Sequence, residues 1–363
     1  MPNIFITGGT GFLGWNIVRL LLEDNSNNIF ILAREKGDAS AFSRIDALLK
    51  GAYKPDDALA LKKRIHIIDG DITEDNLGIG PAELKEFTGK IDTIYHSAAL
   101  CEFGVPYKKI RKINVDGTKN VLDFALDCRP EQFNHISTAA VVGRKGGKFY
   151  EADLDIGQEF NNTYEQTKFE AEKLIEEYRN KGLNISIFRP SVITGDSRTG
   201  EVTNFQMLYQ PLHIFSLELY SEVPADPDVD FNLVPVDYVA KAIYMISSKA
   251  KDNNKAYHLL NSDWITFDVF LDSAARFFGF KKPRLIPVSK FDMAKLRGFS
   301  YKLLEQYIPY MNHEKVIFDT GNSQNALNGD EFRWPKTDES FLETLFRFCD
   351  ESGYIKARTG VLR

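Results

Sequence analysis

Two side chains capable of acid–base chemistry stand four residues apart in the segment "NTYEQTKFEAEKLIEEY", residues 161–177. Tyr164 and Lys168 would lie on one face of a helix, because residues at i and i+4 are neighbours there. Glu and Lys dominate the segment, so the pair is compatible with an ordinary solvated helix, where such a spacing often arises by chance. It is equally compatible with half of an active site, and the rest of the chain has to decide between these interpretations.

The elements that would position this pair follow a regular rhythm over the first 260 residues, where short β-branched runs alternate with amphipathic stretches. Strands are expected at 3–7, 28–33, 64–69, 92–99, 132–138, 184–192 and 256–261. The runs are apolar almost throughout, as in strands buried on both faces. The alternation therefore predicts an α/β chain with a doubly wound, parallel Rossmann sheet that helices cover on both sides.

The rhythm breaks after about residue 200, where an aromatic and aliphatic stretch runs into a Pro/Asp-rich turn. A strand–helix unit returns at "LVPVDYVAKAIYMISSKA", and the chain beyond residue 262 is mainly helix and loop. We therefore expect a Rossmann domain built from 1–200 plus 230–262. A smaller, mainly helical C-terminal cap, built from 201–229 plus 263–363, would bind the substrate.

Composition excludes several classes of protein. The 45 basic and 51 acidic residues give a net charge of −6, which argues against nucleic acid as the main partner. The three cysteines are too few for a disulfide framework, and no CxxC pair indicates a metal site. A strand-like segment follows the first residue almost at once, and no apolar run approaches the roughly 18 residues of a membrane span. We expect a cytoplasmic protein without a signal peptide, membrane span or metal, and composition gives no oligomeric state.

A glycine-rich turn stands directly after the first expected strand, in "NIFITGGTGFLG". Its GxxGxxG spacing permits a tight turn and lets backbone N–H groups approach a pyrophosphate at the positive end of the following helix. A purely structural turn is the alternative, but the position at the first strand–helix junction favours dinucleotide binding. The expected contacts of this turn are Gly8, Thr10, Gly11, Phe12, Leu13 and Gly14.

The end of the second expected strand indicates which dinucleotide binds. NAD sites usually carry an acidic residue there, which holds the ribose 2′-hydroxyl. This strand runs into Arg34, with Arg44 further on, and a guanidinium can pair bidentately with a 2′-phosphate. Glu35 could still reach a ribose hydroxyl, and both arginines could be solvated surface residues. The pattern favours NADP (NADPH) over NAD.

Other expected cofactor contacts lie where later strands end. They are Asp71 and Ile72 after the third strand, Ala98 and Ala99 after the fourth, and Pro190 and Val192 after the sixth. The first two could contact the adenine, and the two alanines are small enough for the cofactor to lie across them.

A dinucleotide fold that also carries Tyr-xxx-Lys beyond its fifth strand resembles the extended short-chain dehydrogenase/reductase (SDR) superfamily. The resemblance implies a catalytic Ser or Thr at the end of the fifth strand, where the sequence offers Ser137 and Thr138, and the superfamily's register favours Thr138. Thr138 would donate a hydrogen bond to the substrate carbonyl oxygen. Lys168 would donate to the nicotinamide ribose, so that it and Tyr164 both touch the cofactor. Asn114, in "KINVDGT", resembles a catalytic-set position that fixes local backbone or a water chain.

This context also sets an expectation for the pKa of Tyr164. A phenol whose unperturbed pKa is about 10 is a weak acid–base group at neutral pH. A nearby ammonium and the positive nicotinamide of the oxidised cofactor both favour the phenolate. We therefore expect the pKa of Tyr164 to be lowered.

Further segments resemble one branch of the superfamily. They are "HSAALCEF", "INVDGTKNVL", "FNHISTAAVVG", "YEQTKFEAEKL", "IFRPSVITGDSRTG" and "LVPVDYVAKAI". Over roughly residues 3–260 they look like the thioester reductase domains of nonribosomal peptide synthetases and carboxylic acid reductases, with fatty acyl-CoA reductases as relatives. The resemblance implies NADPH-dependent reduction of a CoA- or carrier-bound acyl thioester to an aldehyde, or onward to an alcohol. Because the glycine turn begins at the N-terminus, an acyl or peptidyl carrier protein is expected to act in trans.

Two interpretations of the aromatic stretch at 205–220 stay open, since its side chains could line an acyl tunnel or form the core of the cap. The reaction also has alternatives. Dehydratases of the extended class place an Asp-Glu pair after the catalytic Thr, whereas Ala139 and Ala140 follow here, which argues against dehydration. A nucleotide-sugar epimerase and a free ketone or aldehyde reductase remain, and an NADP-sensing regulatory protein is the alternative that performs no chemistry.

Overall fold

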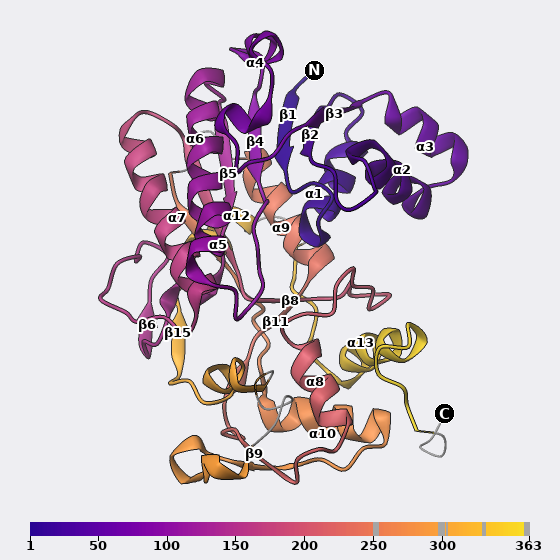
Figure 1. Ribbon diagram of the computed structural model, residues 1–363, viewed down its shortest axis with the longest axis vertical. Coiled ribbons are helices and arrows are strands. Elements are labelled where there is room, and N and C mark those ends of the chain that lie inside the picture. Colours follow the sequence, from indigo (N-terminus) through magenta and orange to yellow (C-terminus); the bar gives the residue numbers. More distant parts are fainter. Residues whose placement is uncertain (250–253, 297–301, 303, 329–331, 359–363) are drawn as a thin grey trace.

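The computed structural model describes residues 1–249, 254–296, 302, 304–328 and 332–358. A sheet with helices on both sides forms the body of the molecule, and a smaller, mostly helical cap lies below it (Figure 1). Within the described part of the chain, no helix has the length and apolar character needed to cross a membrane.

The described part of the body is built on one parallel sheet of seven strands, in the order β12-β7-β5-β4-β1-β2-β3. The strands are β1 (Asn3–Thr7), β2 (Asn28–Ala33), β3 (Ile65–Asp69), β4 (Thr93–His96), β5 (Gln132–Ile136), β7 (Ile185–Pro190) and β12 (Ala256–Leu259). All seven predicted strands are present, and the predicted Rossmann fold is confirmed. The chain order reverses between β1 and β4, where a doubly wound sheet opens a crevice at the carboxyl ends of its strands.

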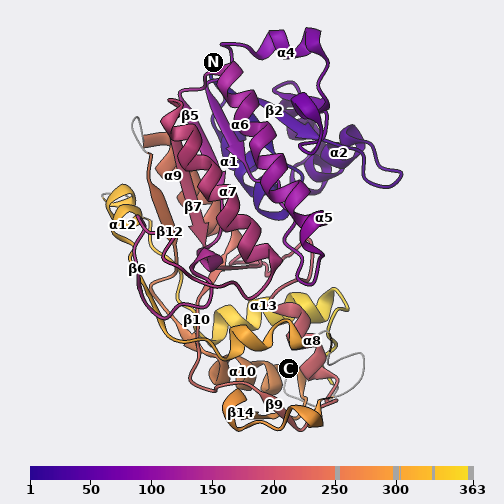
Figure 2. The same cartoon turned by 60° about the vertical axis from the view of Figure 1, so that its left-hand side comes forward.

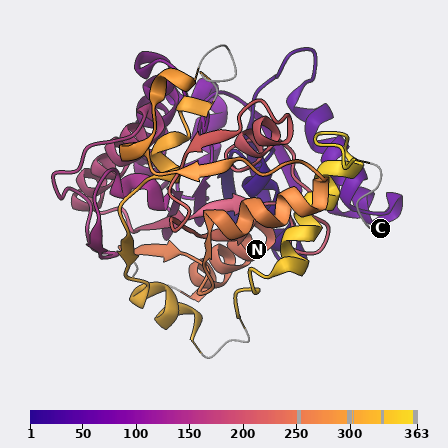
Figure 3. The same cartoon turned by 90° about the horizontal axis from the view of Figure 1, so that it is seen from below.

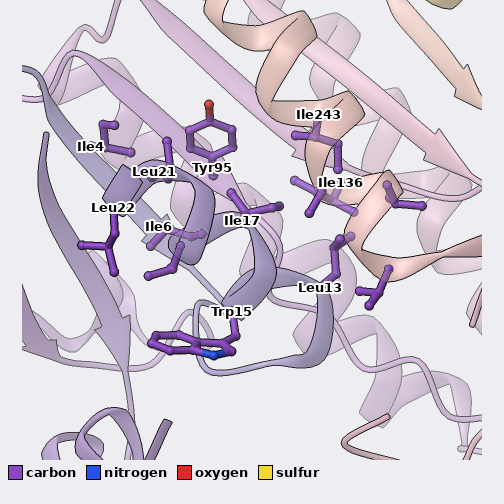
Figure 4. Packing of buried hydrophobic residues seen from close by; sticks show 14 of the residues in the cluster. Ile4, Ile6, Leu13, Trp15, Ile17, Leu21, Leu22, Tyr95, Ile136 and Ile243 are labelled. Carbon is purple, nitrogen blue, oxygen red and sulfur yellow. The ribbon is translucent and has the colours of Figure 1, made fainter. Parts of the chain in front are cut away.

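One face of the sheet is covered by α1 (Phe12–Glu23) and α9 (Val236–Lys249), which pack side by side (Figure 1). Apolar residues at helical spacing make this possible: Ile17, Val18 and Leu21 of α1 are buried in one cluster with Ile243 of α9. Figure 4 shows α1 with its side chains directed into this core. At the β3 end of the same face lie α2 (Ala41–Ala52) and α3 (Pro55–Lys62).

The opposite face carries α4 (Pro81–Phe87), α6 (Gly117–Cys128) and α7 (Thr163–Asn180), and the latter two run alongside one another (Figure 2). A short helix, α5 (Tyr107–Arg111), precedes α6. The ring of Phe5 on β1 packs 4.7 Å from that of Phe124 and 5.9 Å from that of Phe87. Aromatic packing therefore joins the central strand to two helices of this layer.

The cap has its own apolar core, in which Phe270 and Phe346 are almost fully buried. Figure 3 views the molecule from the cap side. Its elements are α8 (Tyr209–Ser216), α10 (Phe267–Phe278), α13 (Glu339–Glu351) and the paired short strands β9 (Glu222–Pro224) with β14 (Arg284–Ile286) and β10 (Asp230–Phe231) with β13 (Ile265–Thr266). The pairing of β8 (Val192–Thr194) with β11 (Leu233–Pro235) lies at the junction with the body.

One C-terminal segment packs against the sheet body. Strand β15 (Val316–Phe318) pairs in parallel with β6 (Gly147–Phe149), and α12 (Gly321–Leu327) lies against α9 and β12. The side-chain amide of Asn322 donates a 3.0 Å hydrogen bond to the Ala256 carbonyl of β12. The predicted division into body and cap stays a prediction. It assigns residues 263–363 to the cap, whereas β15 and α12, which lie within that range, pack against the body.

Candidate active site

In the glycine turn between β1 and α1, the backbone packs directly against other backbone atoms, both within the turn and after β4. Gly8 has a φ of +71°, and a Cβ there would lie 2.5 Å from the backbone nitrogen of Ala98. A Cβ on Gly14 would lie 2.1 Å from the Gly8 carbonyl oxygen, and the Gly11 N–H donates to that oxygen at 2.8 Å. Side chains are therefore excluded where the turn meets the end of β4.

The first turn of α1 is open to an anion. Gly11 is the residue at the helix N-cap, no side chain caps the helix, and the first turn holds no acidic residue. The first N–H groups of a helix lack intrahelical partners and carry its positive end. Backbone donors at a turn without side chains fit the pyrophosphate of a dinucleotide. Of the other predicted contacts here, Thr10 and Phe12 are half-buried, and Leu13 is buried in the core.

The two arginines that follow β2 lie beside this turn. Arg44 donates to the Thr10 hydroxyl at 2.6 Å and to the Arg34 carbonyl at 3.0 Å. Arg34 forms a 2.8 Å ion pair with Asp71. Burial opposes ionisation of Asp71, but hydrogen bonds from Thr73 and Arg34 hold the pKa of its carboxyl below the usual value. Burial, and then the charge of Arg34, lowers the pKa of the Arg44 guanidinium.

The remaining predicted cofactor residues lie at the carboxyl ends of other strands. Ile72 is buried against Gly117 at the start of α6. Ala98 and Ala99 are half-buried after β4, where the Ala98 N–H donates to the Thr7 hydroxyl at 3.3 Å. Pro190 ends β7 and is buried, whereas the half-buried Val192 packs against the core of the cap.

The fold brings Thr138 and Tyr164 together. Thr138 follows β5 and precedes the short 3₁₀ helix Ala139–Val142, while Tyr164 lies in the first turn of α7. The start of α7 lies against this 3₁₀ helix, and the nearby Thr138 side chain acts to lower the pKa of the Tyr164 phenol. Ser137, the neighbouring candidate, instead donates a 2.5 Å hydrogen bond to the buried Glu172 carboxylate. The geometry therefore favours Thr138 over Ser137 as the hydroxyl beside Tyr164.

The pKa of Tyr164 is raised well above its ordinary value. Burial is the main cause, and the neighbouring Cys101 acts in the same direction, while the hydrogen bond with Thr138 opposes them. The expectation of a lowered pKa is therefore wrong for the protein by itself. A buried phenol loses the water that would solvate its anion, and this raises the pKa of Tyr164 by more than Thr138 lowers it.

Lys168 lies one helical turn beyond Tyr164 and is almost fully buried. Its ammonium donates a 2.7 Å hydrogen bond to the Ile136 carbonyl at the end of β5. Burial lowers the pKa of Lys168 to about 8, although the nearby Cys101 and Glu172 oppose that shift. The lysine therefore keeps its positive charge at neutral pH.

Asn114 lies in a π-helical turn, Lys112–Asp116, between α5 and α6. Its side-chain oxygen accepts the Leu100 N–H at 2.7 Å, and its amide donates to the Leu100 carbonyl at 3.0 Å and to the Thr167 hydroxyl at 3.1 Å. Such turns recur at functional sites. Asn114 thus ties the loop after β4 to the helix that carries Tyr164 and Lys168.

Several residues beside Tyr164 were not among the predicted site residues. The ring of Phe103 lies 6.2 Å from that of Tyr164, and the ring of Tyr310 lies 5.2 Å from that of Phe103. Cys101 is solvent-exposed and within interaction distance of the phenol. Cys101 and Phe103 lie in the segment "HSAALCEF", about 60 residues before Tyr164, and Tyr310 lies far beyond it, so their contacts with the phenol could not be predicted from local spacing.

The aromatic stretch after residue 200 mainly supplies the core of the cap. Leu208, Tyr209 and Phe215 are buried there, and the Tyr209 hydroxyl accepts the Gly195 N–H at 2.9 Å. Phe205 stacks on Tyr354 at 3.9 Å between ring centroids. For these residues the interpretation as a core is the one that the packing supports.

The two most specific pieces of the resemblance, "GDSRTG" and "VPVDYVA", meet in space. Ser197 donates from its backbone N–H at 2.9 Å and from its hydroxyl at 2.7 Å to the Asp237 carboxylate at the start of α9. Asp196 accepts the backbone N–H groups of Arg198 and Thr199 at 3.0 and 3.1 Å. These bonds fix the loop between β8 and the cap against the body.

A comparison with known families identifies the chain. The family model described as "Male sterility protein", an NAD-binding domain, matches residues 6–243. The chain belongs to this family. The match covers the Rossmann body from β1 into α9, and it confirms the predicted resemblance to the reductase branch of the extended SDR superfamily.

Several known proteins are similar to this chain over much of its length. A component of the linear gramicidin synthase of Brevibacillus parabrevis is 29% identical over 72% of the chain, and glycine betaine reductase ATRR of Emericella nidulans is 26% identical over 98%. The chain spans only 5% and 29% of their respective lengths. The crystal structure of the terminal R domain from the myxalamid PKS-NRPS biosynthetic pathway superposes with a TM-score of 0.84 at 27% identity, covering 98% of this chain and 92% of that one.

Proposed function

We propose that this chain is an NADPH-dependent reductase that converts an acyl thioester to an aldehyde. The observation that carries the proposal is that the fold brings Thr138, just after β5, to the start of α7, which carries Tyr164 and, one turn further on, the buried Lys168. Membership of the male sterility family and the likeness to a terminal R domain support the reductase class.

The residues around α1 support the choice of cofactor. The glycine turn would hold the pyrophosphate, and Arg34 and Arg44 would pair with a 2′-phosphate that NAD lacks. Bound there, the reduced nicotinamide supplies the hydride for the reaction.

The chain's own groups would act on the carbonyl oxygen of the substrate. Thr138 donates a hydrogen bond to it, and this bond strengthens as negative charge develops. The raised pKa of Tyr164 keeps the proton on the phenol at neutral pH until an oxyanion forms, and the phenol then donates it. Lys168, with a pKa of about 8, would hold the nicotinamide ribose as an ammonium. Asn114 would position the helix without touching the substrate.

A thioester suits this arrangement because the tetrahedral adduct can expel a thiol. A thiol with a pKa near 8.5 is a far better leaving group than an alcohol. Collapse of the adduct gives the aldehyde, and the same hydroxyls could serve a second reduction to the alcohol. We propose CoA or a carrier protein as the thiol that presents the acyl group.

The proposal is tested by following NADPH oxidation with a panel of acyl-CoAs, acyl-carrier thioesters, free aldehydes, free ketones and UDP-sugars, with a hydrazine to trap any aldehyde. We expect turnover with a thioester and a trapped aldehyde in matching amount. Conversion of a UDP-sugar to its epimer, followed by chromatography and without net NADPH oxidation, would indicate the epimerase alternative. NADPH oxidation confined to free carbonyls would indicate a ketone or aldehyde reductase. Tight NADPH binding without any turnover would favour a sensing role.

A further inference from the structure

The carboxylate of Glu165, the residue directly after Tyr164, is buried beside the proposed proton donor. Only 1% of Glu165 is exposed. It accepts hydrogen bonds from the Asn161 N–H at 2.7 Å, from the Asn161 amide at 3.1 Å and from the Tyr310 hydroxyl. A buried carboxylate needs such donors in place of water. The Tyr310 hydroxyl is the one donor here that comes from a distant part of the chain.

The same tyrosine is also linked to Tyr164 through the ring of Phe103. Tyr310 lies in the 3₁₀ helix Ile308–Met311, between α10 and α13 in the chain. Its ring is stacked on Phe103 at 5.2 Å and 8° between planes, and Phe103 lies 6.2 Å from the Tyr164 ring. The Tyr310 hydroxyl also accepts a hydrogen bond from the Asn162 side-chain amide at 2.6 Å, while the Asn162 side-chain oxygen Oδ1 caps α7 by accepting the Glu165 N–H at 3.0 Å.

These contacts link Tyr310 to Tyr164 by two routes, through the start of α7 and through the ring of Phe103. Glu165 and Asn162 hold the start of α7, Phe103 lies on the loop after β4, and Tyr310 joins both. We propose that Tyr310 is a positioning residue for Tyr164, which holds the phenol in place through Glu165 and through Phe103.

This inference rests on the proposed function, since it assigns Tyr164 the role of proton donor. A proton donor displaced by about 1 Å can lose about 10²-fold in rate, so a residue that fixes it contributes to kcat without touching the substrate. Burial strengthens the effect, because water cannot easily replace the lost donor to the Glu165 carboxylate.

Two neighbouring tyrosines allow a matched experiment. Tyr310→Phe removes the hydroxyl that reaches α7 and keeps the ring on Phe103. Tyr307→Phe is the control, because Tyr307 also packs on Phe103, at 5.5 Å, but its hydroxyl donates to Gln210 of the cap helix α8 at 2.5 Å. Glu165→Ala removes the acceptor, whereas Glu165→Gln keeps a carbonyl oxygen that can accept from Tyr310.

We expect Tyr310→Phe and Glu165→Ala each to lower kcat about tenfold, the lower end for a hydrogen bond to a charged group, with KM changed less than about twofold. The kcat of the double variant should fall no further than that of either single variant, because both changes remove the same hydrogen bond between Tyr310 and Glu165. Glu165→Gln should recover most of the activity, and Tyr307→Phe should match wild type. Additive losses, or a wild-type kcat in Tyr310→Phe, would overturn the inference.

A second readout keeps the inference separate from the substrate proposal. Of the three cysteines, Cys101 is exposed and Cys128 and Cys349 are buried, so alkylation by iodoacetamide should occur first at Cys101. Burial nevertheless raises the pKa of the Cys101 thiol, so its alkylation should be slow in wild type and should quicken when the loop that carries Phe103 is loosened. If wild type turns over no thioester or free carbonyl, the proposed function is wrong. The alkylation rate of Cys101 then tests by itself whether Tyr310 holds this part of the structure in place. Faster alkylation in Tyr310→Phe but not in Tyr307→Phe supports that role, and equal rates in all three proteins refute it.

Discussion

The guanidinium of Arg34 lies 2.8 Å from the carboxylate of Asp71, so that residues following β2 and β3 pair across the sheet's carboxyl edge. Both were predicted to contact the cofactor. The Arg34 side chain is 62% exposed, and an ion pair this accessible to water stabilises the fold by only about 0–1 kcal/mol. Arg34 could therefore exchange Asp71 for a 2′-phosphate at little cost.

Replacing Arg34 by alanine should weaken NADPH binding and leave NADH binding unchanged. A lost charge-assisted hydrogen bond costs about 1.5–3 kcal/mol, which corresponds to a rise of about 10- to 100-fold in the dissociation constant of NADPH. Fluorescence titration of both cofactors measures this directly. Arg347→Ala, which changes an exposed arginine on α13 of the cap, is the control. An unchanged preference for NADPH in Arg34→Ala would remove Arg34 from the site.

The two proposed catalytic hydroxyls should respond differently to small changes. Tyr164→Phe should lower kcat by at least about 10²-fold, because no other proton donor replaces the phenol. Thr138→Val should cost about 10²-fold through the lost donor to the oxyanion, while Thr138→Ser keeps most of the activity. Tyr150→Phe, at a tyrosine that is 49% exposed, is the control. Stopped-flow single turnovers distinguish slow chemistry from slow release, and a Tyr164→Phe variant with wild-type single-turnover rates would contradict the assignment.

The sequence predicted the body of the fold because its signals are local. Strands buried on both faces are apolar along their whole length, so β1, β2 and β7 were placed within a residue or two. The glycine turn and the helix that carries Tyr164 and Lys168 are likewise visible as local patterns, although their role in catalysis stays a prediction. Each of these features depends on residues within one or two turns of the chain.

The features that the sequence did not reveal depend on contacts between distant segments. Tyr310 reaches Glu165 across 145 positions, and β15 pairs with β6 without any hydrophobic alternation that would mark either strand. The pKa of Tyr164 was misjudged for the same reason. Its burial depends on Phe103 and on the packing around it, which are unknown until the chain is folded.

A buried ion pair behind the active site should matter greatly for stability. Arg189 of β7 pairs with Glu172 of α7 at 2.7 Å, and the exposed fractions of the two side chains are 2% and 0%. Glu172 also accepts the Ser137 hydroxyl next to Thr138. Removing one partner leaves an uncompensated buried charge, so Arg189→Met should lower the free energy of unfolding by about 3–5 kcal/mol.

Urea denaturation measures this loss. The matched control is Arg276→Met, at an arginine that is 57% exposed and pairs with Asp272 and Glu339 on the surface of the cap. That change should cost no more than about 1 kcal/mol. Equal losses in the two variants would mean that the buried pair contributes no more than a surface pair.

Lys168 should assist the proposed reaction but lower the free energy of unfolding of the protein. Its pKa falls from 10.5 to about 8 because burial penalises the ammonium. Between these two values the unfolded chain binds a proton that the folded protein does not, so this contribution to the free energy of unfolding rises with pH. The penalty is fully present below pH 8 and fades by about pH 10.5.

Replacing Lys168 by methionine should therefore abolish activity and raise the free energy of unfolding at pH 7. At 1.36 kcal/mol per pKa unit, removing the penalised ammonium should raise the free energy of unfolding by about 3 kcal/mol. The Ile136 carbonyl then loses its hydrogen-bond donor, which should lower the free energy of unfolding by about 1 kcal/mol. The expected net gain is about 2 kcal/mol. Urea denaturation of both proteins at pH 7 and pH 10 tests the sign, because the gain must shrink at the higher pH. Lys173→Met, at an exposed lysine on the same helix, should show no such pH dependence. A gain that grows with pH, or a variant less stable than wild type at pH 7, would mean that burial does not penalise the Lys168 ammonium.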